Sequence, residues 1–138
     1  MPEAMDENEL RQYSAIVLAF IGDAVFELMV RSRLVALGNR KVKDLHLDTV
    51  ARVKAASQAK MVQELHSELN EAEQDVFRRG RNAKLTPPRH ADMTDYRMST
   101  GFEAVLGYLY LKGDEKRLQY LAERALHLDL PPSAGGDG

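Results

Sequence analysis

The chain has 138 residues, of which 44% are apolar and 29% charged, and its formal net charge is −2. These values favour one globular domain and exclude a uniformly basic protein. Nucleic-acid binding stays open, because it depends on where the positive charges gather. The absence of cysteine excludes disulfides and thiolate metal sites, and a reducing cytoplasm is therefore the expected location.

Neither a signal peptide nor a membrane span is expected. The N-terminus has no basic stretch followed by an apolar core. Residues 15–30 are the most apolar run, but Asp23 and Glu27 interrupt it and it is short for a membrane helix. This run is therefore interpreted as a buried helix of an all-α protein.

Apolar periodicity, capping residues and stop signals predict six helices and no strand. Ser14 is the expected N-cap of the first helix and Gly38 its stop, while Thr94 and Asp114 are expected to cap the last two helices. The predicted helices cover residues 14–37, 42–47, 47–69, 71–79, 95–112 and 115–128. Residues 82–92 contain two prolines and are predicted to form a loop.

These elements predict an N-terminal extension at residues 1–12 and a domain at residues 13–128. The remaining residues, 129–138, are rich in Pro, Ser, Gly and Asp. Such a composition has little to bury, so this tail is expected to be disordered.

Two carboxylates lie in unusually apolar helices. In residues 15–30 only Gly22, Asp23 and Glu27 are not apolar, and Glu103 is the only charged residue of 101–111. Helices of this kind are expected at the centre of a fold, where a carboxylate needs a positive partner. That partner is either a basic side chain or a divalent ion shared by both carboxylates. Mg²⁺ suits oxygen ligands and activates water at a phosphate.

Gly22 precedes Asp23 directly and has two open explanations. A glycine inside a helix costs about 1 kcal/mol relative to alanine. It either permits another helix to cross closely beside Asp23 or is a tolerated defect.

Basic residues gather around the predicted loop, after an acidic segment at residues 68–75. They are Arg78, Arg79, Arg81, Lys84, Arg89 and His90, with Arg97 shortly after. Such residues suit contacts to nucleic-acid phosphates, although a solvated charge run is the alternative. Lys54, Ser57, Gln58 and Lys60 offer a possible extension of this surface. Aromatic residues do not interleave with the basic ones, which favours a duplex over stacked single strands.

Four segments carry a resemblance to a known family. Residues 18–27 (LAFIGDAVFE) resemble the signature helix of ribonuclease III catalytic domains, whose core reads FLGDA, and residues 102–111 (FEAVLGYLYL) resemble their second catalytic helix. Residues 79–84 (RGRNAK) and 96–103 (YRMSTGFE) narrow the match to the Mini-ribonuclease III branch. The similarity runs from about Tyr13 to Leu128.

The resemblance implies an all-helical, Mg²⁺-dependent homodimer that cleaves double-stranded RNA and matures the large-subunit ribosomal RNA precursor. Asp23 and Glu103 align with the catalytic, metal-binding carboxylates of the family. No separate double-stranded-RNA-binding domain is expected in this branch, so the chain's own surface must hold the substrate. The residues expected to bind RNA are Arg78, Arg79, Arg81, Lys84, Lys54 and Arg97.

The sequence departs from the wider family at two positions. A Glu is expected four residues before the signature Asp, and an Asp three residues before the later Glu, but these positions hold Ala19 and Thr100. We therefore expect a depleted site that holds metal weakly until an RNA phosphate completes its shell. Two alternatives are a non-catalytic relative that binds double-stranded RNA or the ribosome, and a plain helical interaction domain. Retention of Asp23 and Glu103 favours the hydrolase.

Overall fold

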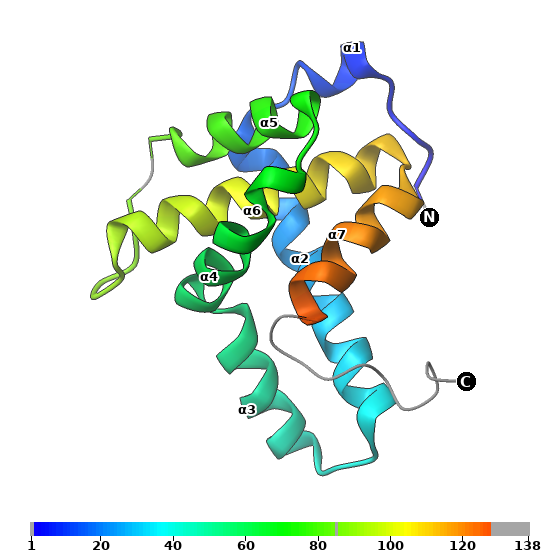
Figure 1. The fold of residues 1–138 in the computed structure, drawn as a ribbon, viewed down its shortest axis with the longest axis vertical. Coiled ribbons are helices and arrows are strands. Elements are labelled where there is room, and N and C mark those ends of the chain that lie inside the picture. Colours follow the sequence, from blue (N-terminus) through cyan, green and yellow to red (C-terminus); the bar gives the residue numbers. More distant parts are fainter. Residues whose placement is uncertain (1, 85, 128–138) are drawn as a thin grey trace.

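The fold is described by a computed structural model that covers residues 2–84 and 86–127. These residues form α-helices and one short 3₁₀ helix, η1, with no strand among them, which confirms the predicted all-α class (Figure 1). The helices are α1 (Glu7–Leu10), α2 (Ala15–Leu37), α3 (Val42–Val53), α4 (Ala55–Leu65), η1 (His66–Glu68), α5 (Glu71–Arg81), α6 (Met93–Lys112) and α7 (Glu115–His127). The predicted disordered tail at 129–138 lies outside the described residues. No helix in the described part is long and apolar enough to cross a membrane.

Helix α6 is the centre of the molecule, with α2 crossing it and α4 and α5 packed along it (Figure 1). From residue 99 to residue 109, every position of α6 is buried except Glu103. The rings of Phe26 on α2 and Phe102 on α6 meet edge to face at 5.3 Å. This core fixes the relative positions of the two helices that carry the candidate carboxylates.

The crossing of α2 and α6 depends on two glycines. A Cβ atom on Gly22 would lie 1.7 Å from the carbonyl oxygen of Glu103, and a Cβ on Gly107 would lie 1.9 Å from the carbonyl oxygen of Leu18. Real side chains do not fit at such distances, so the two backbones touch only because these residues are glycines. Of the two explanations for Gly22, close helix crossing is the correct one.

Most predicted helix ends are confirmed. The Ser14 hydroxyl accepts a hydrogen bond from the Val17 amide at 3.2 Å, and Asp114 accepts one from the Arg117 amide at 3.1 Å. The cap of α6 was predicted wrongly: Asp92, not Thr94, accepts from the Asp95 amide at 2.9 Å. Asp92 is the residue with extended backbone in front of the helix, and only there does a side chain reach the free amides.

The predicted helix boundary near residue 47 is also wrong. The chain stays helical through Val53 and breaks at Lys54, whose φ of −67° and ψ of 156° are extended. The break has a packing reason, because α3 lies against α2 whereas α4 lies against α6. One straight helix would not reach both partners. Figure 1 shows α3 leaving the body of the molecule beside the C-terminal half of α2.

The segment before α2 packs on the domain through α1, a short helix that the sequence pattern did not predict. Leu10 is buried in the core, and the Met5 amide donates a hydrogen bond to the Leu111 carbonyl at 2.8 Å. The Tyr108 hydroxyl donates to Glu7 at 2.6 Å. These contacts tie the N-terminal segment to the second half of α6, away from Glu103.

Candidate active site

A cleft of about 820 Å³ opens between α2, the start of α4 and the first half of α6. The loop between α5 and α6 closes one side of it, through Pro88, His90, Ala91 and Asp92. Both candidate carboxylates, Asp23 and Glu103, line this cleft. The sequence left open whether their helices meet, and the structure brings the two residues together.

Local geometry explains why these positions converge. Gly22, the residue before Asp23, lies against the backbone of Glu103 itself. Ala19 and Thr100 lie one helical turn before Asp23 and Glu103, so each falls on the same face as the carboxylate that follows it. Both residues line the same cleft. All four positions singled out by the family pattern therefore meet at one place.

The surroundings of Asp23 differ from the prediction. Helix α2 was expected to be buried all round, but only one stripe of it is, and Asp23 is exposed at the cleft. Phe20 and Leu28 on the uncovered side are 76% and 66% exposed. An apolar sequence therefore does not imply burial here, because part of the apolar surface of α2 has no cover within the described chain.

Glu103 is half-buried, and its partner is not the basic side chain considered above. One carboxylate oxygen, Oε2, accepts a hydrogen bond from the side-chain amide of Gln58 at 3.1 Å. The other influences on Glu103 are burial and the neighbouring Asp23 carboxylate. Within the described residues, the positive charge that this pair needs is not supplied by an arginine or lysine.

The electrostatics of Glu103 follow from this environment. The pKa of Glu103 is raised to about 8, mainly by burial and also by hydrogen bonding to Asp23 and repulsion by its charge. The hydrogen bond from Gln58 opposes them, because it stabilises the ionised carboxylate. Near neutral pH the metal-free pair therefore retains a proton, and a cation bound there would replace it.

The two positions that depart from the family pattern add little to the site. Ala19 offers no ligand atom, and the Thr100 hydroxyl donates its hydrogen to the Tyr96 carbonyl at 2.9 Å. Among the described residues, no group of three or more acidic, histidine or cysteine side chains is arranged to hold a metal. The site thus offers two carboxylates together with open space for water or substrate oxygens.

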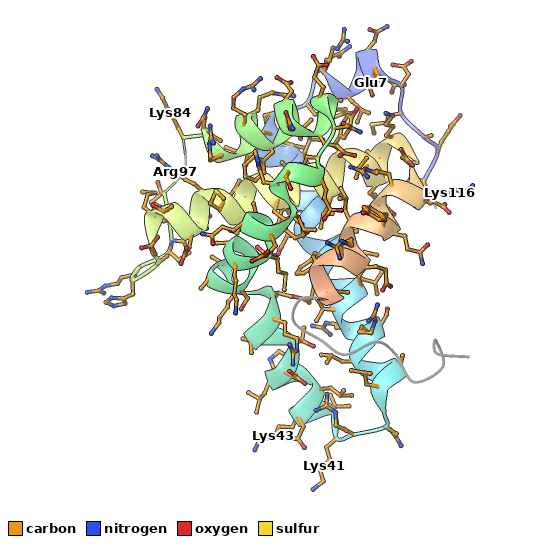
Figure 2. The ribbon with its side chains drawn as sticks, viewed as in Figure 1. Glu7, Lys41, Lys43, Lys84, Arg97 and Lys116 are labelled. Atoms are coloured by element: carbon orange, nitrogen blue, oxygen red, sulfur yellow. The ribbon has the colours of Figure 1, made fainter. Side chains whose placement is uncertain are left out.

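The residues predicted to bind RNA are dispersed around the cleft. Of the six, Lys54 alone is among the residues that line it. Lys84 and Arg97 are exposed and lie on the same side of the molecule, where the loop leaves α5 and enters α6 (Figure 2).

The three arginines of α5 make other contacts. Arg78 pairs with Asp75 at 2.6 Å on the surface, and Arg81 donates to the Asn82 side chain at 3.3 Å. Arg79 is half-buried and donates to the backbone carbonyl of Tyr13 at 2.9 Å. The contact of Arg79 ties α5 to the start of α2, so its guanidinium has a structural use independent of RNA.

The sequence interpretation missed the role of Gln58. It was grouped with Lys54, Ser57 and Lys60 as a possible part of a basic surface, but only 1% of it is exposed. A signal was present, because Gln58 lies three, four and seven residues before Met61, Val62 and Leu65. This spacing places it on the apolar face of α4, where a polar residue needs a specific partner.

Comparison with known proteins identifies the family to which the chain belongs. Residues 16–114 match the family description Ribonuclease III domain. The chain is 44% identical over 127 residues to Mini-ribonuclease 3 of Thermoanaerobacter sp., covering 91% of this chain and 89% of that protein. It is 50% identical over 114 residues to Mini-ribonuclease 3 of Gloeobacter violaceus, covering 83% of each.

A solved structure agrees as well. The crystal structure of a Fusobacterium nucleatum protein superposes with a TM-score of 0.79 at 29% identity, and the match covers 88% of this chain and 98% of that one. The matched family region contains both Asp23 and Glu103. The chain therefore belongs to the ribonuclease III family, in its Mini-ribonuclease III branch, and is an endoribonuclease.

Proposed function

We propose that this endoribonuclease hydrolyses double-stranded RNA with Mg²⁺ held by Asp23 and Glu103. The observation that carries the proposal is the meeting of these two carboxylates, from two crossing helices, in an open cleft. A cleft of about 820 Å³ leaves room for a hydrated ion and a phosphate beside them. Gly22 and Gly107 let α2 and α6 cross closely enough to bring the two carboxylates together.

The donor set fits a hard divalent cation. Carboxylate oxygens are the ligands that Mg²⁺ prefers, and it retains several waters when few protein ligands are present. Burial, together with the neighbouring Asp23 carboxylate, raises the pKa of Glu103 to about 8, and a cation bound there would stabilise its ionised form. When bound, the ion supplies an activated water and offsets charge developing at the scissile phosphate. Asp23 and Glu103 orient it, while Gln58 holds one oxygen of Glu103.

The composition of the site predicts weak metal binding by the free protein. Ala19 and Thr100 occupy the positions where the wider family pattern has further carboxylates, and the Thr100 hydroxyl is directed to Tyr96. A second ion about 4 Å away, as in two-metal sites, would have few protein oxygens to hold it. We expect one Mg²⁺ to bind weakly in calorimetry without RNA and to bind more tightly with an uncleavable duplex.

Substrate contact is assigned to exposed basic residues near the cleft. Lys54 lines it, and Lys84 and Arg97 stand beside the loop that forms its wall (Figure 2). Cations at these places suit the phosphates of a duplex, which give affinity without sequence information. Arg78 and Arg81 are surface residues that extend this region, whereas the carbonyl contact of Arg79 limits its share.

We further propose a homodimer, formed through the uncovered face of α2. Ile16, Val17, Phe20 and Leu28 are between 41% and 76% exposed. Beside them, Leu28, Met29, Tyr110 and Leu118 line a hollow of about 480 Å³. Exposed apolar patches of this kind are typical of protein interfaces. A two-fold pair of chains would supply two oppositely oriented sites, as the two antiparallel strands of a duplex require.

We propose that the biological substrate is the large-subunit ribosomal RNA precursor, in the cytoplasm, as the resemblance to this branch implies. A transcript of its double-stranded stem is the direct probe. We expect cleavage of this stem in both strands, whereas a single strand of the same sequence should remain intact.

One assay tests the proposed activity. The purified protein is incubated with a long RNA duplex, in Mg²⁺ or in excess chelator, with single-stranded RNA as the control. Cutting of the duplex in Mg²⁺ alone is the expected result. Equal cutting in chelator, or preferential cutting of the single strand, would refute the proposal.

A further inference from the structure

The lining of the cleft contains a buried polar side chain that is neither a metal ligand nor an RNA-binding residue in the proposed function. Gln58 lies on α4, is 1% exposed, and its Nε2 donates to Oε2 of Glu103 at 3.1 Å. Gln58 also lines the cleft that contains Asp23 and Glu103. We infer that Gln58 is a positioning residue, which holds the Glu103 carboxylate in its metal-binding orientation; the inference rests on the proposed metal site.

The backbone around Gln58 is built to fix this contact. The extended residue Lys54 ends α3 and redirects the chain, so that α4 packs along α6. Ala59, Met61 and Val62 are each 2% exposed and anchor the face of α4 that carries Gln58. The donor therefore approaches Glu103 from a rigid helix, and side chains on rigid elements hold a ligand group more accurately than those on loops.

The chemical nature of the donor matters. An arginine or lysine at this position would pair with Glu103 and compete with a metal cation for its charge. A neutral amide donates a hydrogen bond without cancelling that charge, so the carboxylate is oriented and stays available. The bond also favours the ionised form of Glu103, because it lowers the pKa that burial raises.

A purely structural role of Gln58 and a positioning role predict different effects of removing its amide. If the amide only satisfied the core, its removal would change the stability of the fold and leave metal binding as it was. If it positions Glu103, its removal weakens metal binding, and the effect depends on Glu103 being present. The two uses are therefore separable by measuring metal affinity in the absence of RNA.

The test uses Gln58→Met, which keeps an unbranched side chain of similar length but removes the donor. Gln63→Met on the same helix is the matched control, because Gln63 is exposed. Mn²⁺ binding is followed by proton relaxation on the full chain without RNA. Loss of such a supporting hydrogen bond typically costs about 10–100-fold in metal affinity. We expect a loss in this range for Gln58→Met and none for Gln63→Met.

Three further measurements locate the effect. In a Glu103→Gln background, Gln58→Met should cause no additional loss of Mn²⁺ affinity, because the two residues act as a unit. In cleavage assays, the Mg²⁺ concentration for half-maximal rate should rise by about the same 10–100-fold. The dissociation constant for duplex RNA measured in chelator should be unchanged.

Unchanged Mn²⁺ affinity in Gln58→Met, or an equal loss with and without Glu103, would overturn the inference. If Gln58→Met does not fold, the wild-type protein answers the question by NMR. The Gln58 side-chain amide should shift on Mg²⁺ addition and on Glu103→Gln substitution, while that of Gln63 should not; a silent Gln58 amide would overturn the inference. Failure of wild-type protein to cut duplex RNA refutes the proposed function instead, and leaves the Mn²⁺ result to judge Gln58.

Discussion

Gly22 and Glu103 touch through their backbones, and a Cβ atom on Gly22 would stand 1.7 Å from the Glu103 carbonyl oxygen. This contact sets the separation of α2 and α6 at the level of the cleft. Because Asp23 follows Gly22 directly, the same contact also fixes where its carboxylate stands relative to Glu103. The geometry of the candidate site is thus a consequence of how closely two helices cross.

Gly22→Ala should therefore destabilise the protein. Alanine is favoured over glycine in a helix by about 1 kcal/mol. The clash with Glu103 opposes this gain, and overpacking of a core typically costs about 1–3 kcal/mol, occasionally more. We expect a net decrease in the free energy of unfolding, measured in urea, and loss of cleavage. Gly107→Ala should have the same two effects. Full stability together with full activity in either variant would show that the crossing tolerates a methyl group.

The raised pKa of Glu103 makes the stability of the metal-free protein depend on pH. The folded chain retains a proton on Glu103 up to about pH 8, whereas the unfolded chain loses it near the ordinary value of 4.5. Between these values the folded state binds more protons, so this group's contribution to stability falls as pH rises. Glu103→Gln removes that decline, and its stability relative to wild type should therefore increase over this range.

The measurement is urea unfolding in chelator at a series of pH values. Glu27→Gln is the control, since Glu27 lies on the surface of α2 and pairs with Arg31 at 2.8 Å. This variant should retain the decline. Parallel stability curves for wild type and Glu103→Gln would contradict the assigned environment of Glu103.

Basic residues near the cleft should control RNA affinity. Lys54→Ala, Lys84→Ala and Arg97→Ala should each weaken duplex binding and lower the salt slope by roughly one unit, as the loss of one phosphate contact does. Lys116→Ala is the control, because Figure 2 shows Lys116 on the opposite side from Lys84 and Arg97. Arg79→Ala should instead lower stability, through its lost bond to Tyr13.

These constants are measured in chelator across a salt series, so that cleavage does not interfere. If Lys116→Ala lowers the salt slope of RNA binding as much as Lys54→Ala does, the RNA-binding surface is not localised near the cleft. An unchanged slope in all three cleft variants would mean that these cations are only solvated surface charges.

The uncovered face of α2 predicts how the proposed dimer is disrupted. Leu28→Glu places a charge where Leu28, 66% exposed, lines the apolar hollow, and should convert the dimer to the 15.5 kDa monomer. Val42→Glu is the control, because Val42 is 80% exposed on α3 and lies outside that hollow. Light scattering gives the mass. A Leu28→Glu protein that stays dimeric, or a monomeric wild type that cuts both strands, would contradict the proposed interface.

Several features could be predicted from sequence because they depend on neighbours along the chain. Ser14 and Asp114 cap the helices that follow them, and Gly113 ends α6 with a φ of 82°. The all-α class follows from the same local patterns. Asp23 and Glu103 were identified because a charge in an apolar helix needs a reason.

Other features depend on contacts between distant segments and were missed. The break at Lys54 exists because α3 and α4 pack on different helices, which periodicity within either does not reveal. The exposure of Asp23 and Phe20 also escaped prediction, because apolar residues that face a partner resemble those that face a core. Gln58 was considered only as a possible part of the basic surface, because its partner is 45 residues away in the chain.

Asp23 and Glu103 together form the proposed catalytic metal site. Asp23→Asn and Glu103→Gln keep side-chain shape but remove a carboxylate ligand, and Glu27→Gln is the same kind of change on the outer surface of α2. The decisive measurement is the initial rate of duplex RNA cleavage in saturating Mg²⁺, with helical circular dichroism as the check on folding. We predict loss of cleavage in both site variants and wild-type cleavage in Glu27→Gln, with all three folded. Near-normal cleavage by folded Asp23→Asn or Glu103→Gln would contradict the account.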